Sequence, residues 1–144
     1  MTETIKARDE QLETRAREGL ACRLRPKEVL GKRGPIPHLG ELVLENRSPA
    51  PLEIAYTLTP LQYLDLVVVG PSGTVVSEGH FSDRFSPTLE PTILRLLPGE
   101  VFTAQVPLLG TVPQDKRTPG VYTVQAVYEY NGCRIVADPV TVTV

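Results

Sequence analysis

The chain has 144 residues, of which 41% are hydrophobic and 22% are charged, and its formal net charge is -2. These values are typical of one globular domain and exclude a disordered chain. The slight acidic excess gives no general attraction to nucleic acid or to an anionic membrane surface, so neither is expected as a partner.

The N-terminal segment, residues 1–18, differs in composition from the domain expected over residues 19–144. It is polar and charged, and Ile5, Leu12 and Ala16 give it only a thin apolar stripe. An isolated helix of this length is marginal in water, so we expect a short helix or a flexible extension. The segment lacks the apolar centre of a signal peptide, and no apolar run reaches the roughly 20 residues that span a bilayer. The sequence therefore predicts a cytoplasmic location.

From residue 19 onward, apolar and polar residues alternate with the period of a β-strand. Leu20, Cys22 and Leu24 alternate with Ala21, Arg23 and Arg25, which predicts a strand that ends at Pro26. A further strand is expected near 41–45, with Leu42 and Leu44 on one face and Glu41, Val43 and Glu45 on the other. Another is expected over 52–58, with Leu52, Ile54, Tyr56 and Leu58 inward. The more continuous apolar run 64–69 is expected to be buried on both faces and to turn at 70–73 into a second arm over 74–77.

The second half continues in the same way, with strands expected near 93–96, 101–108, 121–130 and 133–144. Asn131-Gly132 predicts a two-residue hairpin, because a type I′ turn needs positive φ at both positions. Asp138-Pro139 predicts an edge position or a bulge. Helical periodicity is missing after residue 20. The sequence therefore predicts an all-β antiparallel sandwich, immunoglobulin-like or fibronectin-like, of about 7–9 strands.

The segment Pro119-Gly120-Val121-Tyr122 resembles the penultimate strand of immunoglobulin-like domains, in which a tyrosine hydroxyl bonds back to a loop. The chain also resembles the bacterial intracellular proteinase inhibitor family, over roughly residues 40–130. That narrower likeness lies in the stretches Asp65–Val76, Leu94–Glu100, Pro119–Tyr122 and Leu44–Ser48. These motifs consist of turn and core residues, so the resemblance implies an immunoglobulin-like fold and does not itself imply inhibition.

The sequence offers no catalytic apparatus, and neither an enzyme nor a cofactor is expected. Phosphate-binding loops, HExxH and Cys-x-x-Cys motifs are missing. His80 and Asp83 lie beside two serines, but neighbours in one loop rarely form a triad. Cys22 and Cys133 are expected to be thiols in a reducing cytosol, with a disulfide as the alternative.

The long segment Glu78–Pro91 is the candidate partner-binding loop. It contains Phe81, Arg84 and Phe85, residue types enriched at protein interfaces. Alternatively, both phenylalanines fold back and close one end of the sandwich. A basic stretch (Arg23, Arg25, Lys27, Lys32 and Arg33) is interpreted as a solvated strand face and loop, with contact to an acidic partner as the alternative.

The leading functional hypothesis is a non-catalytic protein-interaction module, alone or as a subunit of a larger assembly. Its partner is expected to be another protein or a second copy of the chain, because sandwich edges invite strand addition. The alternative is an intracellular proteinase inhibitor that presents Glu78–Pro91 or Gly110–Gly120 to a protease. A carbohydrate-binding module is a weaker hypothesis, since Tyr128 and Tyr130 alternate with polar residues in a way that places them inside.

Overall fold

A computed structural model describes residues 19–35, 37–79 and 90–144 of the chain. Within these ranges the regular structure consists of antiparallel strands and two short 3₁₀ helices, which confirms the prediction of an all-β fold. None of the helices described is long and apolar enough to cross a membrane.

The first half of the chain contains β1 (Leu20–Pro26), β2 (Leu30–Gly31), β3 (Gly34–Pro35), β4 (Leu39–Asn46), β5 (Leu52–Tyr56), η1 (Pro60–Tyr63) and β6 (Leu64–Val69). The second half contains β7 (Thr92–Leu96), β8 (Val101–Pro107), η2 (Gln114–Lys116), β9 (Val121–Tyr130), β10 (Cys133–Val136) and β11 (Val140–Thr143).

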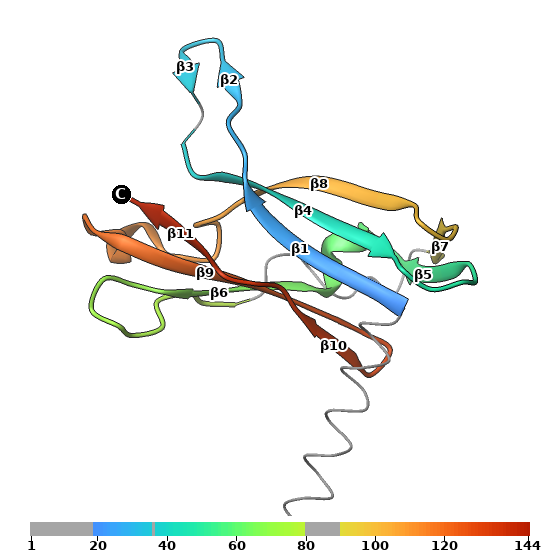
Figure 1. The fold of residues 1–144 in the computed structure, drawn as a ribbon. Helices are drawn as coiled ribbons and strands as arrows, with labels where there is room; N and C mark the ends of the chain where they lie inside the picture. The colour runs from blue at the N-terminus through green and yellow to red at the C-terminus, as the bar shows by residue number, and fades with distance from the viewer. Residues whose placement is uncertain (1–18, 36, 80–89) are drawn as a thin grey trace, which may run out of the picture.

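Two sheets form the body of the molecule. In the first sheet, β4 lies between β1 and β8. In the second, the long strand β9 pairs with β6 along one edge and with β10 and β11 in succession along the other. Figure 1 shows these sheets as two layers, with the β2–β3 ribbon projecting from the body and the β5–β7 ribbon at one end.

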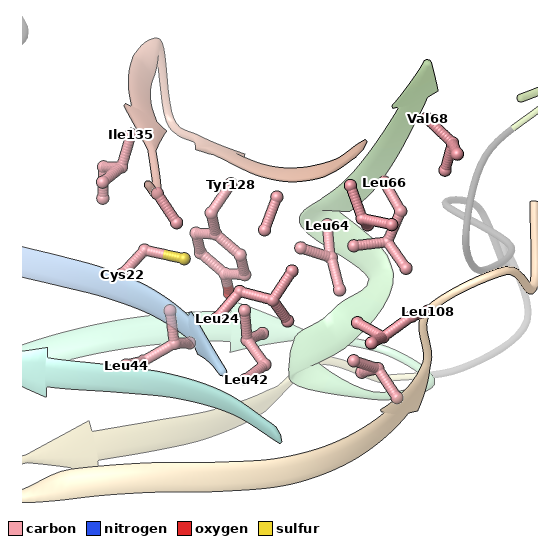
Figure 2. Packing of buried hydrophobic residues seen from close by; sticks show 14 of the residues in the cluster. Cys22, Leu24, Leu42, Leu44, Leu64, Leu66, Val68, Leu108, Tyr128 and Ile135 are labelled. Carbon is pink, nitrogen blue, oxygen red and sulfur yellow. The ribbon is translucent and has the colours of Figure 1, made fainter. Parts of the chain in front are cut away.

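The alternating residues of both sheets meet in one hydrophobic core. Tyr122, Val124, Ala126 and Tyr128 of β9 are buried in the same cluster as the inward side chains of β1 and β4. Figure 2 shows Cys22 and Leu24 of the first sheet facing Tyr128 and Leu64 of the second. The alternation expected for β1 and β4 and the inward position expected for Tyr128 of β9 are therefore confirmed.

Two expectations about burial were wrong. Leu58 is 45% exposed, because β5 ends at Tyr56 and the chain then bends toward η1. The bend is held by Gln62 Oε1, which accepts hydrogen bonds from the backbone N–H groups of Thr57 and Leu58. The run in β6 is not buried on both faces, since buried and half-buried residues alternate along it. Val43 of β4 lies on the face opposite Leu42 and Leu44, as expected, and is also buried, at 2% exposure.

Two predicted turn features are confirmed, and one predicted arm is shorter than expected. Asn131 and Gly132 have φ angles of 52° and 80°, as a type I′ hairpin requires. The Tyr122 hydroxyl donates to Thr118 O at 2.6 Å and accepts from Thr118 N at 2.7 Å, closing the predicted contact with its loop. Residues 74–77 contribute only an isolated bridge between Val69 and Val75, not a strand.

Candidate functional site

The residues predicted to bind a partner, Phe81, Arg84 and Phe85, lie outside the described residues, so their role stays a prediction. The other predicted loop, Gly110–Gly120, is described and is held against the body. Thr111 Oγ1 donates to Leu66 O at 2.9 Å, and the Arg117 guanidinium donates to the carbonyls of Leu109 and Val112. The side chains that anchor this loop are therefore engaged within the chain.

A groove of about 440 Å³ runs along β1, between the two sheets. One wall is formed by residues 20–25 of β1, and the other by Ile135 and Val136 of β10 with Asp138 after it. Val43 and Arg47 complete the lining. The groove therefore lies where an edge of the first sheet faces an edge of the second.

The hydrogen bonds of β1 show which backbone groups face this groove. Lys27 N donates to Leu39 O at 3.0 Å, and Arg47 N donates to Gly19 O at 2.7 Å, on either side of the β1–β4 register. In an antiparallel pair, hydrogen-bonded residues alternate with residues whose N–H and C=O point away from the partner strand. Odd-numbered residues of β1 therefore bond to β4, while Leu20, Cys22 and Leu24 direct their N–H and C=O groups away from it.

In the described part of the chain, β1 pairs with β4 alone, and no backbone hydrogen bond reaches the outward groups of Leu20, Cys22 and Leu24. The open edge ends at Pro26, which has the same orientation but no N–H to offer. We call this row of outward groups from Leu20 to Leu24 the open edge of β1.

The facing wall is also a strand edge. The Ala137 N–H donates to Ala126 O at 2.9 Å and continues the β9–β10 pairing that begins at the tight turn between Tyr130 and Cys133. By the same alternation, Arg134 and Val136 of β10 direct their backbone groups away from β9. Two strand edges therefore flank the groove.

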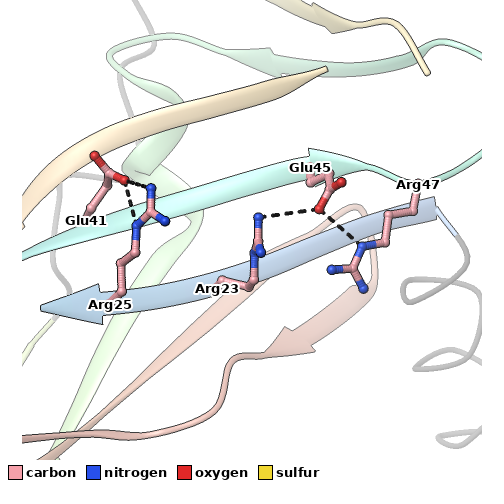
Figure 3. Close-up of polar contacts among 5 residues, drawn as sticks. All are labelled: Arg23, Arg25, Glu41, Glu45 and Arg47. Atoms are coloured by element: carbon pink, nitrogen blue, oxygen red, sulfur yellow. Dashed lines mark hydrogen bonds and ion pairs between the residues drawn. The ribbon is translucent and has the colours of Figure 1, made fainter. Parts of the chain in front are cut away.

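A row of ion pairs covers the outer face of β1 and β4, and Figure 3 shows most of its members. Glu41 accepts hydrogen bonds from both Arg25 and Lys27, with Lys27 Nζ 2.9 Å from Glu41 Oε2. Glu45 lies between Arg23 and Arg47, whose nearest nitrogens are 3.5 and 3.2 Å from Glu45 Oε1. We call these residues the charged ladder: Arg23, Arg25, Lys27, Glu41, Glu45 and Arg47.

The charged ladder carries more positive than negative charge, because four cations contact two carboxylates. Hydrogen bonds from Lys27 and Arg25 lower the pKa of Glu41 below its ordinary value. The sequence identified Arg23, Arg25 and Lys27 but missed their acidic partners and Arg47. Glutamates at outward positions of the next strand, Glu41 and Glu45, were the signal that could have revealed the ladder.

The two cysteines are not bridged: both are thiols in the structure. Cys22 is buried and its sulfur points toward the Tyr128 ring (Figure 2). Burial raises the pKa of the Cys22 thiol to about 12, so this group stays protonated near neutral pH. Cys22 therefore acts as a small core residue.

The tyrosines that could have formed a sugar platform are engaged inside. The Tyr128 hydroxyl donates to Pro60 O at 2.8 Å, and the Tyr130 hydroxyl accepts from Ala55 N at 2.9 Å. Over the described ranges, histidine, cysteine and acidic side chains do not gather in any group of three or more that could hold a metal ion. The groove along β1 is thus the best-defined candidate site.

No protein-family model matches this chain, and no curated protein matches it. What the protein binds is therefore inferred from its own geometry.

Proposed function

We propose that this protein is a non-catalytic protein-binding module with an immunoglobulin-like sandwich fold. We propose further that it binds an extended segment of another protein as an additional strand on β1. The observation that carries this proposal is the open edge of β1, whose outward N–H and C=O groups line a groove. Such an edge is a template for an incoming strand, with main-chain hydrogen bonds supplying affinity.

The order of strands supports the immunoglobulin-like assignment. In that fold, strands A, B and E share one sheet and strands C, F and G share the other. Here β1, β4 and β8 match the first set, and β6, β9 and the β10–β11 pair match the second. Tyr122 near the start of β9 makes the loop contact typical of the F strand.

The groove has the dimensions and lining that an added strand needs. Neighbouring strands lie about 4.8 Å apart, so a segment paired with β1 would lie within the groove. Its inward side chains would cover the row of Leu20, Cys22 and Leu24 and contact Ile135, all of which are buried and apolar. The segment would thereby extend the first sheet and the core together.

A matched pair of variants at Cys22 tests this proposal. Cys22→Pro removes an N–H that points into the groove, while the β1–β4 hydrogen bonds come from the odd-numbered residues and remain available. Pro26 already occupies a position of the same orientation. Cys22→Ala is the control, because it loses the same thiol and keeps the N–H.

The experiment is affinity purification from the source cells with the full chain and both variants, followed by calorimetry with the purified partner. We expect the unaltered chain and Cys22→Ala to retain one stoichiometric protein and Cys22→Pro to lose it. Thermal unfolding of each variant shows that it is folded. A folded Cys22→Pro that binds the same partner with unchanged affinity would contradict the proposal.

A further inference from the structure

We infer that the segment accepted by the open edge of β1 alternates apolar residues with acidic ones. This inference rests on the proposed strand addition and names the chemistry of the partner. It follows from the two side-chain rows of β1: Leu20, Cys22 and Leu24 of the inner row are buried, whereas Arg23 and Arg25 of the outer row, which follow the buried Ala21, are exposed.

Residues directly opposite each other on neighbouring strands point to the same face of a sheet. In an added strand, the positions opposite Leu20, Cys22 and Leu24 would therefore face the core, where apolar side chains are stabilised. The positions between them would lie on the outer face beside Arg23 and Arg25. Side chains there determine which segments bind well.

Charge decides which side chains suit the outer positions. On the β4 side, Arg23 and Arg25 already contact Glu45 and Glu41, and each of those carboxylates is shared with a second cation. On the groove side, Asp138 is the single carboxylate among the lining residues, against Arg23, Arg25 and Arg47. Acidic side chains on the added strand would supply the missing negative charge, whereas cations there would be repelled.

The same arrangement disfavours a second copy of β1 as the occupant. A pair of β1 edges would bring Arg23 and Arg25 of both copies onto one face and would add no carboxylate from the paired strands. Like charges on neighbouring strands are destabilising, and edge cations are a known device against self-pairing. An acidic segment of a different protein is therefore the occupant that the charges favour.

The test is an NMR titration of the ¹⁵N-labelled full chain with short capped peptides. In the first peptide valine and glutamate alternate, and in two others lysine or glutamine replaces glutamate. A further control has the valines and the glutamates in separate blocks. Dissociation constants come from the amide signals, and binding at the edge is confirmed by slower hydrogen exchange at Leu20, Cys22 and Leu24.

We expect the alternating glutamate peptide to bind about tenfold more tightly than the glutamine peptide, since each new charged cross-strand pair contributes modestly. The lysine peptide and the blocked peptide should bind more weakly than either. In the Arg23→Gln/Arg25→Gln variant, the preference for glutamate over glutamine should disappear while the glutamine peptide still binds. Arg95→Gln, at an exposed arginine of β7 away from the groove, is the matched control and should keep the preference.

Methylation of the peptide backbone separates pairing from simple charge attraction. We take the added strand to be antiparallel, so that the valines lie opposite Leu20, Cys22 and Leu24 and direct their N–H groups toward β1. N-methyl groups on valine should therefore abolish binding. N-methyl groups on glutamate, which point away from β1, should be tolerated better. Equal sensitivity at both positions would contradict strand addition at this edge.

The remaining outcomes distinguish the two proposals. Equal affinity for all three alternating peptides, with slower exchange at Cys22, would overturn the acidic preference and leave strand addition standing. Binding of the blocked peptide or of single-stranded DNA as tightly as the alternating glutamate peptide would show plain anion binding and overturn the inference. Absence of binding by every peptide at millimolar concentration would contradict both.

Discussion

Asn46 is a polar residue with no exposed surface, and every polar group of its side chain is used. Its Nδ2 donates to Ala50 O at 2.9 Å and to Leu96 O at 2.8 Å. Its Oδ1 accepts from the backbone N–H and the hydroxyl of Ser48. The Gly99 N–H also donates to the Asn46 carbonyl at 2.8 Å. Asn46 therefore joins the β4–β5 turn to the β7–β8 turn.

Replacing this amide with a carboxylate of the same shape tests that role. Asn46→Asp would place an acceptor against the carbonyls of Ala50 and Leu96, and would bury a charge. We expect a loss of about 3 kcal/mol in the free energy of unfolding at neutral pH, measured by urea denaturation. Ser48→Ala, at a more exposed hydroxyl, should cost about 1 kcal/mol. A loss below about 0.5 kcal/mol for Asn46→Asp would show that Asn46 does not hold the turns together.

Glu41 provides a test of the charged ladder through pH. The hydrogen bonds from Lys27 and Arg25 favour its ionised form and lower its pKa in the folded state. The stabilisation from this carboxylate is therefore present above its unfolded pKa and is lost as the pH falls through the lower folded pKa. We expect an NMR titration of the Glu41 side-chain carboxyl to give a pKa below the ordinary glutamate value. In Arg25→Gln that pKa should rise, and an unchanged value would contradict the ladder as described.

The strand β9 begins directly after Gly120, which lies so close to Pro71 that only glycine fits there. Gly120 has a φ of 144°, and its backbone exchanges two hydrogen bonds with Val144, the residue after β11. A Cβ at this position would lie 2.4 Å from Pro71 Cγ and 2.7 Å from Pro71 Cβ. The approach of the 70–73 turn to the start of β9 therefore leaves no room for a side chain.

Two alanine substitutions separate this contact from backbone strain. Gly99 also has a positive φ, 83°, but a Cβ there meets nothing within 4 Å. Gly99→Ala should cost about 1 kcal/mol, from strain alone. Gly120→Ala should cost about 3 kcal/mol, because strain and the clash with Pro71 add. Chemical denaturation measures the free energy of unfolding of both variants. Equal losses would show that the 70–73 turn moves away from a side chain at position 120 at little cost.

The strands with the clearest alternation could be predicted from the sequence, since alternation is a local property. The end of β1 at Pro26 and the inward row of β9 were readable in this way, and the Asn131-Gly132 turn was readable from its residue types. The exposure of Leu58 was not, because it depends on where β5 ends and on the hydrogen bonds that Gln62 Oε1 accepts from the Thr57 and Leu58 N–H groups. The burial of Val43 was not predicted either, since alternation assigns a residue to a face of the sheet and does not show what covers that face.

For the molecule as a whole, the candidate site could be predicted only in part. The sequence showed the cations Arg23 and Arg25 and the general tendency of sandwich edges to accept strands. It could not show that β1 and β10 flank one groove, because Cys22 and Ile135 are brought together only by the packing of the two sheets. The register that places Glu41 beside Arg25 likewise depends on pairing between segments distant in the chain.

Hydrogen exchange in the isolated full chain tests the open edge of β1 most directly. The amides of Ala21, Arg23 and Arg25 bond to β4, whereas those of Leu20, Cys22 and Leu24 point into the groove. We predict slow exchange at the first set and clearly faster exchange at the second, measured residue by residue by NMR. Equally slow exchange at Cys22 and Leu24 would show that the edge is already paired within the chain, and would contradict strand addition there.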